Sequence, residues 1–224
     1  MRYLFPALCL AVLFSPPATA QFKIGLEAGP DWNQLRTTIS NVVSTEYVSV
    51  IGYHVDIPLQ YKIRDWFSVE AAPSFLQKNY KLQWTGPFSS LYQTNKNGYA
   101  QIPLMGNFLF TSHRIQFVAQ VGGYAGYWVY GRVKGNLPDP FINTYSYDSA
   151  YVFRSNRDER WELGWLAGGR LAYDCGKTGQ VFIDGRYYES VTGRQKNYMT
   201  GQIQEYDRTW VFSVGLLFNK LPRL

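Results

Sequence analysis

The chain alternates apolar and polar residues over long stretches, most clearly from Ile51 to Tyr61. Every second residue of this stretch, starting at Ile51, is apolar, and the residues between are small or polar. Only an extended strand sends successive side chains to opposite faces, so this period of two predicts a β-strand with one apolar face. The stretch is also as long as the about 9 to 11 residues that a tilted strand needs to cross a bilayer.

The same alternation recurs along the rest of the chain. The expected strands cover residues 22–36, 51–61, 67–75, 99–110, 115–129, 161–173, 180–188 and 209–218. The segments Gln83–Gly98, Gly131–Glu159 and Val191–Asp207 are polar or irregular, and we expect loops there. Beyond the N-terminus there is no apolar run of the about 18 residues that a spanning helix needs. Eight strands without intervening helices predict an antiparallel up-and-down barrel, because closure removes the exposed sheet edges.

Two kinds of barrel fit this pattern. A soluble lipocalin-like barrel turns its apolar face inward around an apolar ligand, whereas a transmembrane barrel turns it outward into lipid. The connections 62–65, 111–114 and 174–179 are tight, while those between the other strands are long. Short turns at one rim and long loops at the other are typical of outer-membrane barrels.

The aromatic residues of the apolar face support the transmembrane alternative. They gather near the two ends of the strands, as in the aromatic girdles that anchor barrels at the headgroups. The opposite face repeats charges and glycines, and exposing it to lipid would cost about 2 to 4 kcal/mol per basic residue at mid-depth. The sequence therefore predicts an all-β, eight-stranded antiparallel up-and-down transmembrane β-barrel with its apolar face outward.

The N-terminus has the pattern of an export signal. Arg2 precedes a short apolar run, and Ala18-Thr19-Ala20 forms a small-residue cleavage site. We therefore expect residues 1–20 to be a cleaved signal peptide and residues 21–224 to form the barrel domain. This predicts a multi-pass protein of the cell outer membrane, with both termini in the periplasm.

Composition excludes several classes of protein. The net charge of +6 has no block of like charges, so the sequence predicts no nucleic-acid partner. Only Cys175 lies outside the expected signal, which excludes an intrachain disulfide and a thiolate metal site, and the pattern assigns this cysteine no role. The expected partners are outer-membrane lipid and a protein or surface ligand at the long loops.

Five short motifs in the strands resemble a known family. They are Lys23–Gly29, Glu70–Phe75, Gln101–Leu104, Gly122–Tyr127 and Phe182–Tyr187. Together with the closing aromatic strand, they resemble the PorT-like outer-membrane β-barrel domain of Gram-negative bacteria. The resemblance covers essentially all of the chain after the expected signal. It implies a small outer-membrane barrel and, by analogy only, an accessory part of an envelope secretion or assembly machine.

The inward face carries one constellation of titratable residues. One hypothesis is a proton or ion path through the lumen. The favoured alternative is a structural ion-pair network, since eight strands leave space only for side chains. The candidate lumen network comprises Glu27, His54, Asp56, Glu70, Glu162, Arg170, Asp184 and Arg186.

Catalysis has little support in the sequence. The two histidines, His54 within a strand and His113 in a tight turn, both lie outside the long loops. We predict no enzymatic activity, no catalytic residue, no cofactor and no metal site.

The long loops carry a bias toward aromatic residues and arginine, which is typical of contact surfaces. The alternative, weighed equally, is a loop that packs on itself over the barrel mouth. The predicted function is a structural or interaction role, with a secretion accessory and a soluble apolar-ligand carrier as alternatives. The candidate contact residues are Phe141, Tyr145, Tyr147, Tyr151, Phe153, Arg154 and Arg157.

Overall fold

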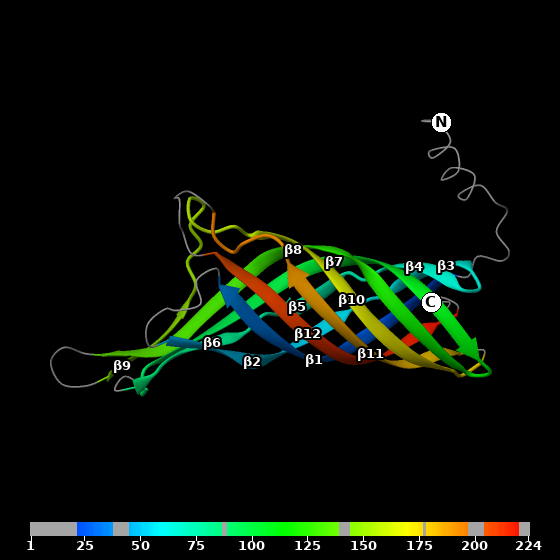
Figure 1. The fold of residues 1–224 in the computed structure, drawn as a ribbon, viewed down its shortest axis with the longest axis horizontal. Helices are drawn as coiled ribbons and strands as arrows, with labels where there is room; N and C mark the ends of the chain where they lie inside the picture. The colour runs from blue at the N-terminus through cyan, green and yellow to red at the C-terminus, as the bar shows by residue number, and fades with distance from the viewer. Residues whose placement is uncertain are drawn as a thin grey trace, which may run out of the picture.

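The structure is a closed antiparallel β-barrel (Figure 1). This computed structural model describes residues 22–37, 45–86, 89–138, 144–176, 178–196 and 204–219. The expected signal peptide, residues 1–20, lies outside the described residues. No helix in the described ranges is long and apolar enough to span a membrane.

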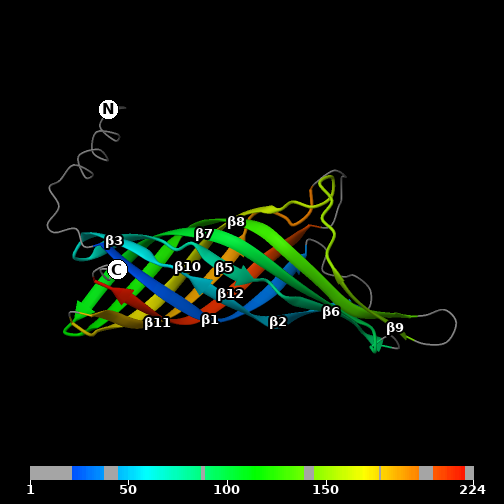
Figure 2. The same cartoon turned by 180° about the vertical axis from the view of Figure 1, so that it is seen from behind.

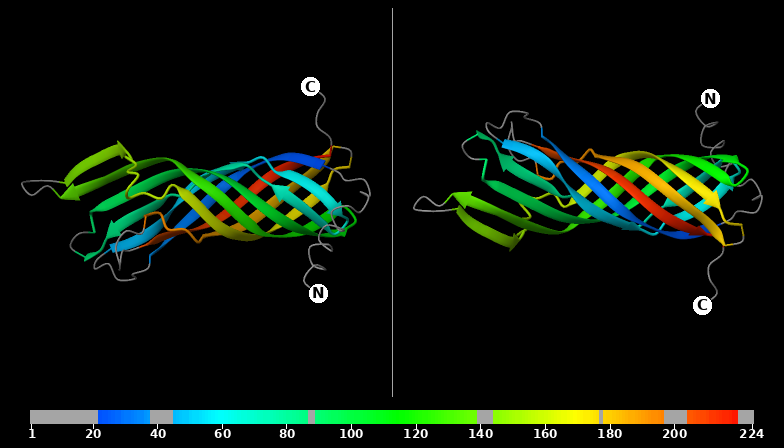
Figure 3. Two further views of the ribbon diagram at one scale, coloured as in Figure 1. Left: turned by 90° about the horizontal axis from the view of Figure 1, so that it is seen from above. Right: turned by 90° about the horizontal axis from the view of Figure 1, so that it is seen from below.

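Twelve strands build the sheet of the described residues. They are β1 (Phe22–Thr37), β2 (Thr45–Asp56), β3 (Leu59–Arg64), β4 (Phe67–Ala71), β5 (Ser74–Gln77), β6 (Tyr80–Trp84), β7 (Tyr92–Ser112), β8 (Ile115–Pro138), β9 (Thr144–Ala150), β10 (Trp161–Asp174), β11 (Gly179–Ser190) and β12 (Glu205–Phe218). Neighbouring strands are antiparallel throughout, and the strands cross the long axis obliquely (Figure 3). β1 pairs with β12 on one side and with β2 and β3 on the other, which closes the ring.

The ring contains the eight wall-spanning segments that the sequence predicts, and we call each of them a stave. Some staves consist of more than one of the twelve strands. β2 and β3 are one stave interrupted at Pro58, and β4, β5 and β6 are another, interrupted first at Pro73. Proline lacks an N–H, so it breaks the ladder of hydrogen bonds. The staves still stay joined, because Gly25 N donates to Pro58 O at 2.9 Å and Ile57 N donates to Pro73 O at 3.0 Å. β9 is an additional strand, and β8 is the neighbour with which it pairs among the described strands.

The apolar face points outward along the whole barrel. Leu104 is 62% exposed and Phe212 is 48% exposed, whereas Asp56 and Arg170 are each only 1% exposed. The outward register predicted from the sequence is therefore confirmed. The lipocalin-like alternative is wrong, because its apolar ligand would need the apolar face inside.

Outward aromatic residues pair across neighbouring strands near both ends of the staves. The rings of Tyr127 and Trp161 lie 5.1 Å apart, and Phe110 lies 6.2 Å from Phe117 near the opposite rim. We call these ends the long-loop rim and the short-turn rim. Phe22 and Phe218 both lie near the short-turn rim, where Ile24 pairs with Phe218.

Three segments expected to be loops contain strands. β7 begins at Tyr92 within Gln83–Gly98, and β12 begins at Glu205 within Val191–Asp207. Within Gly131–Glu159, β8 continues to Pro138 and turns back as β9. These polar strands lack apolar alternation, but their ladders satisfy the backbone, as in the pairs from Gln93–Gly135 to Asn97–Gly131. The outer halves of β6, β7 and β8, with β9, therefore project beyond the ring as an extension (Figures 1 and 2).

Candidate functional site

The half of the lumen nearer the short-turn rim is centred on Arg170 of β10. Its two terminal nitrogens donate to the two carboxylate oxygens of Glu70, each at 2.9 Å, and its Nε donates to Asp184 Oδ2 at 2.9 Å. The guanidinium also lies 4.1 Å from the centre of the Phe182 ring. Nε and both terminal nitrogens thus each donate to a carboxylate oxygen. Such hydrogen bonds offset the cost of burying the guanidinium charge.

Arg186 of β11 lies beside it and shares a partner. Its Nε donates to Asp184 Oδ1 at 2.9 Å and its Nη2 donates to Asp56 Oδ2 at 2.9 Å. Nη2 also contacts Glu27, and Nη1 donates to the Tyr188 hydroxyl at 3.2 Å. Asp184 thus bridges the two arginines, so the two guanidiniums belong to one network.

The structure brings seven of the eight candidate lumen residues together. We call this group the Arg170–Arg186 cluster, and its other members are Glu27, His54, Asp56, Glu70 and Asp184. Every member is at most 4% exposed. Four carboxylates face two guanidiniums, so the cluster carries a formal charge of −2 when His54 is neutral.

Glu162 is the candidate that lies apart. It accepts hydrogen bonds from Lys78 and from the Tyr124 hydroxyl, and Lys78 Nζ lies 5.0 Å from the centre of the Tyr99 ring. Sequence analysis missed Lys78, because the alternation decays beyond Leu76. Continuing the even-numbered inward positions past that residue would have placed Lys78 inside the barrel.

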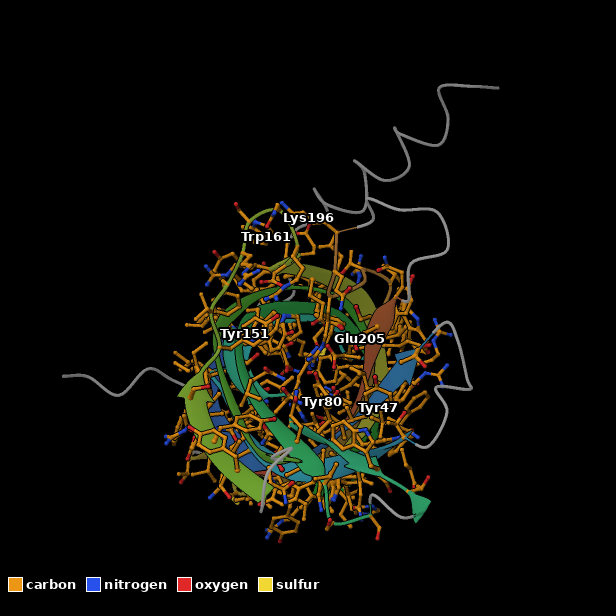
Figure 4. All side chains as sticks on the ribbon, turned by 90° about the vertical axis from the view of Figure 1, so that its left-hand side faces the viewer. Tyr47, Tyr80, Tyr151, Trp161, Lys196 and Glu205 are labelled. Atoms are coloured by element: carbon orange, nitrogen blue, oxygen red, sulfur yellow. The ribbon has the colours of Figure 1, made fainter. Side chains whose placement is uncertain are left out.

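Arg194, also missed, closes the lumen near the long-loop rim. It lies in the connection between β11 and β12, and its Nε and Nη2 each lie 2.7 Å from an oxygen of Asp207. Asn33 donates to the same carboxylate at 2.7 Å, and the guanidinium lies 4.9 Å from the Tyr80 ring. Figure 4 looks toward this rim, where side chains, including the labelled Tyr80, occupy the interior of the ring.

The expected loop contact surface packs largely on the barrel mouth. The rings of Tyr151 and Phe153 lie 5.0 and 4.9 Å from Trp128, and Arg157 Nε donates to Asp158 at 2.6 Å. Tyr147 donates to Gln93 at 3.1 Å, whereas Tyr145 is 65% exposed and Arg154 is exposed. Phe141 lies outside the described residues.

A pocket of about 650 Å³ opens on the outer face of the extension. Arg132 donates to both oxygens of Asp148, at 2.6 and 3.1 Å, and these hydrogen bonds hold the pKa of Asp148 below its ordinary value. Sequence analysis missed this pocket, because its residues come from strands expected to be loops. We call it the extension pocket, and its lining residues are Tyr92, Thr94, Lys96, Tyr130, Arg132, Lys134 and Asp148.

A closed antiparallel ring with an apolar exterior, aromatic residues near both rims and a charged, filled interior defines a transmembrane β-barrel. The sequence profile of the outer membrane protein beta-barrel domain matches residues 15–194. The chain belongs to this family, so it is an outer-membrane β-barrel protein, and lipid covers its outward apolar face.

Several solved structures have a similar architecture. Ail, the attachment invasion locus protein of Yersinia pestis, is 13% identical, with a TM-score of 0.43 over 88% of this chain and 99% of Ail. Neisserial surface protein A is 13% identical, with a TM-score of 0.47 over 89% and 97%. OprG from Pseudomonas aeruginosa is 9% identical, with a TM-score of 0.48 over 89% and 97%. No curated protein matches the sequence.

Proposed function

We propose that this barrel is a non-catalytic interaction module that binds an anionic ligand at the cell surface through the extension pocket. The long-loop rim then faces the exterior, and the residues 21–224 that follow a cleaved signal begin and end in the periplasm. The short turns near His113 and Cys175 support this orientation, because outer-membrane barrels keep short turns on the periplasmic side.

The location of the pocket along β8 supports a ligand in the headgroup layer or beyond it. Phe117 and Tyr127, which lie near the two aromatic levels, delimit 11 residues, about the length that crosses the hydrocarbon. A tilted strand advances roughly 2.5 Å per residue along the membrane normal. Arg132 and Lys134 therefore lie roughly 12 to 17 Å beyond Tyr127, outside the hydrocarbon.

The charge of the extension pocket carries the proposal. Three cations line it against the single carboxylate of Asp148, which is paired with Arg132. Lys96 and Lys134 thus leave an excess positive charge, and Lys81 adds another cation 4.9 Å from the Tyr92 ring. The volume falls within the about 300 to 1,000 Å³ of small-ligand sites. A phosphate-bearing saccharide fits this combination of aromatic walls and cations.

The test measures binding to the barrel in nanodiscs. The probes are lipopolysaccharide and its delipidated, phosphorylated saccharide, which distinguish a membrane source from a free one. We expect the double substitution Lys96→Gln and Lys134→Gln to weaken binding at least tenfold and to reduce its salt dependence. Lys62→Gln with Arg64→Gln removes the same charge at the short-turn rim and serves as the control. Equal binding by both double variants would contradict the proposal.

The absence of catalysis is also part of the proposal. His54 lies in the lumen and His113 lies in a turn at the short-turn rim, so neither can serve a nucleophile at the long-loop rim. The carboxylates of Asp148 and Asp158 at that rim are engaged by arginines. We infer that the lumen network is structural, because ion pairs and rings occupy the interior from Arg170 to Arg194.

The finer resemblance to PorT-like barrels supports a second candidate function, an accessory role in an envelope secretion or assembly machine. The motifs Lys23–Gly29 and Phe182–Tyr187 contribute Glu27, Asp184 and Arg186 to the buried cluster. These motifs therefore line the lumen, and none of their residues lines the extension pocket. Co-purification of the barrel with other envelope proteins after crosslinking in cells tests this role, and recovery of the barrel alone would contradict it.

A further inference from the structure

Three members of the Arg170–Arg186 cluster form a compact group of metal-ligating side chains. Glu27 of β1 pairs in register with Asp56 of β2, and His54 occupies the next inward position of β2. His54 Nε2 lies 3.3 Å from Asp56 Oδ1 and 3.6 Å from Glu27 Oε1. Ligands about 2.0 to 2.2 Å from a tetrahedral metal ion lie roughly 3.3 to 3.6 Å from one another. The observed separations match the edges of such a tetrahedron.

The hydrogen bonding of this group is incomplete. His54 is only 3% exposed, yet neither ring nitrogen has a hydrogen-bond partner among the described residues, and the same holds for Asp56 Oδ1. A buried polar atom without a partner gives up its hydrogen bonds to water and gains none in return, so native structures rarely leave one. Nε2 of His54 and Oδ1 of Asp56, which make no hydrogen bond of good geometry, lie 3.3 Å apart. A cation bound between them would satisfy both.

The electrostatics of the cluster also favour a further cation. The cluster carries a formal charge of −2 with neutral His54, and charge of this size is costly in a buried site. A divalent ion would neutralise it. Asp56 Oδ1 remains available to such an ion, because Arg186 donates to Oδ2 of the same carboxylate. Glu27 Oε1 already contacts Arg186 and Ser213, so this oxygen would be shared between them and the ion.

We propose that Glu27, His54 and Asp56 bind a divalent transition-metal ion within the lumen, with Zn²⁺ as the representative. One imidazole and two carboxylates suit zinc and its neighbours in the first transition row, whereas Ca²⁺ and Mg²⁺ prefer six or more oxygen ligands. The ion would link β1 to β2, with a water molecule as the fourth ligand of the tetrahedron. Because the site is buried, it is loaded as the barrel folds. Sequence analysis predicted no metal site, because it considered these three residues only as parts of a lumen ion-pair network or ion path.

The experiment refolds the full chain from urea into detergent with Zn²⁺, removes the excess ion, and measures zinc per chain. A heat-dependent shift on a gel confirms that each sample is folded. We expect about one Zn²⁺ per chain and a higher melting temperature for the wild type. His54→Gln and Asp56→Asn should each lose both effects. His113→Asn removes the only other histidine and Glu162→Gln removes a buried carboxylate elsewhere, and both should keep the zinc.

Direct spectroscopy makes the test independent of how the variants fold. Refolding the wild type with Co²⁺ should give the absorption bands of a tetrahedral site, and Mg²⁺ should not displace them. Folded wild type that retains no zinc would overturn the proposal, as would His54→Gln with full zinc content. Stabilisation by mild acid without zinc binding would also overturn it, because protonated His54 would then supply the missing charge.

Discussion

Arg170 of β10 and Glu70 of β4 form a bidentate ion pair across the lumen, with both nitrogen–oxygen distances at 2.9 Å. β7 and β8 lie between these strands in the ring, so the pair joins separate walls of the barrel. Removing the guanidinium would leave Glu70 buried without its ionic partner, and Asp184 would keep only its pair with Arg186. Loss of one member of a buried pair costs about 3 to 5 kcal/mol. We expect Arg170→Met to lower the free energy of unfolding by that amount in urea titrations in lipid vesicles.

The double variant Arg170→Met with Glu70→Gln provides the control for this prediction. It removes the unpaired charge as well as its partner, so it should recover part of the loss. Equal stability of Arg170→Met and the wild type would show that the pair does not stabilise the folded barrel.

Because side chains fill the lumen, we expect the barrel not to conduct ions. The Arg170–Arg186 cluster, the Lys78–Glu162 pair and the Arg194–Asp207 pair occupy successive levels of the interior. Eight strands leave space only for side chains, and here the side chains are locked by ion pairs. We expect no steady single-channel current from the purified protein in planar bilayers. Reproducible conductance steps that scale with protein concentration would contradict this prediction and favour an ion path.

The sequence predicts most of the barrel, because the period of two is unambiguous wherever one face meets lipid. Leu104 and Phe212 lie outward and Glu70 and Arg170 lie inward, as their alternation requires. Inward charges on separate strands also indicate that a shared network exists. Their pairing depends on register and shear, so the contact between Arg170 and Glu70 follows only from the closed ring.

The elements that the sequence did not predict lie where no lipid selects the pattern. β9 and the outer half of β8 are held by backbone pairing, and the residues of the extension, such as Thr94, do not alternate in polarity. Lys78 lies beyond Leu76, where the apolar residues stop alternating, so the sequence no longer marks its inward position even though the even-numbered register continues. Arg194 reaches Asp207 from a connection between strands, and the conformation of such a connection depends on tertiary contacts.

A charged side chain placed at an outward position near the middle of the membrane should destabilise the barrel. Leu104 is 62% exposed on the outer face, about halfway between Ala100, which pairs with Tyr127, and Phe110, which pairs with Phe117. Leu104→Arg should destabilise the barrel by about 2 to 4 kcal/mol in lipid vesicles, the cost of a basic residue at the bilayer midplane. Tyr145→Arg is the matched control, because Tyr145 is 65% exposed but lies on the extension beyond the ring. An equal effect of both substitutions would place Leu104 outside the hydrocarbon.

The connection 151–160 should loosen in acid because of Asp158. Burial by itself raises the pKa of this carboxyl, but hydrogen bonds from Arg157, the Arg154 N–H and Tyr151 hold the pKa below its ordinary 3.8. A lowered pKa means that the charged form stabilises the folded connection. This stabilisation is complete above the unfolded value and is lost as the pH falls below 3.8 through the folded pKa.

Hydrogen exchange measures this loss directly. We expect the protection factors of the Tyr151–Asp158 amides to fall about tenfold or more between pH 5 and pH 2.5, as expected for a lost charged hydrogen bond. Asp158→Asn should show the low protection at both pH values, because its amide cannot accept from the Arg157 guanidinium as a carboxylate does. The amides of β10 act as the internal reference, since their ladder to β8 is independent of Asp158. Unchanged protection in the wild type at pH 2.5 would mean that the packing of Tyr151 and Phe153 against Trp128 orders the connection without the carboxylate.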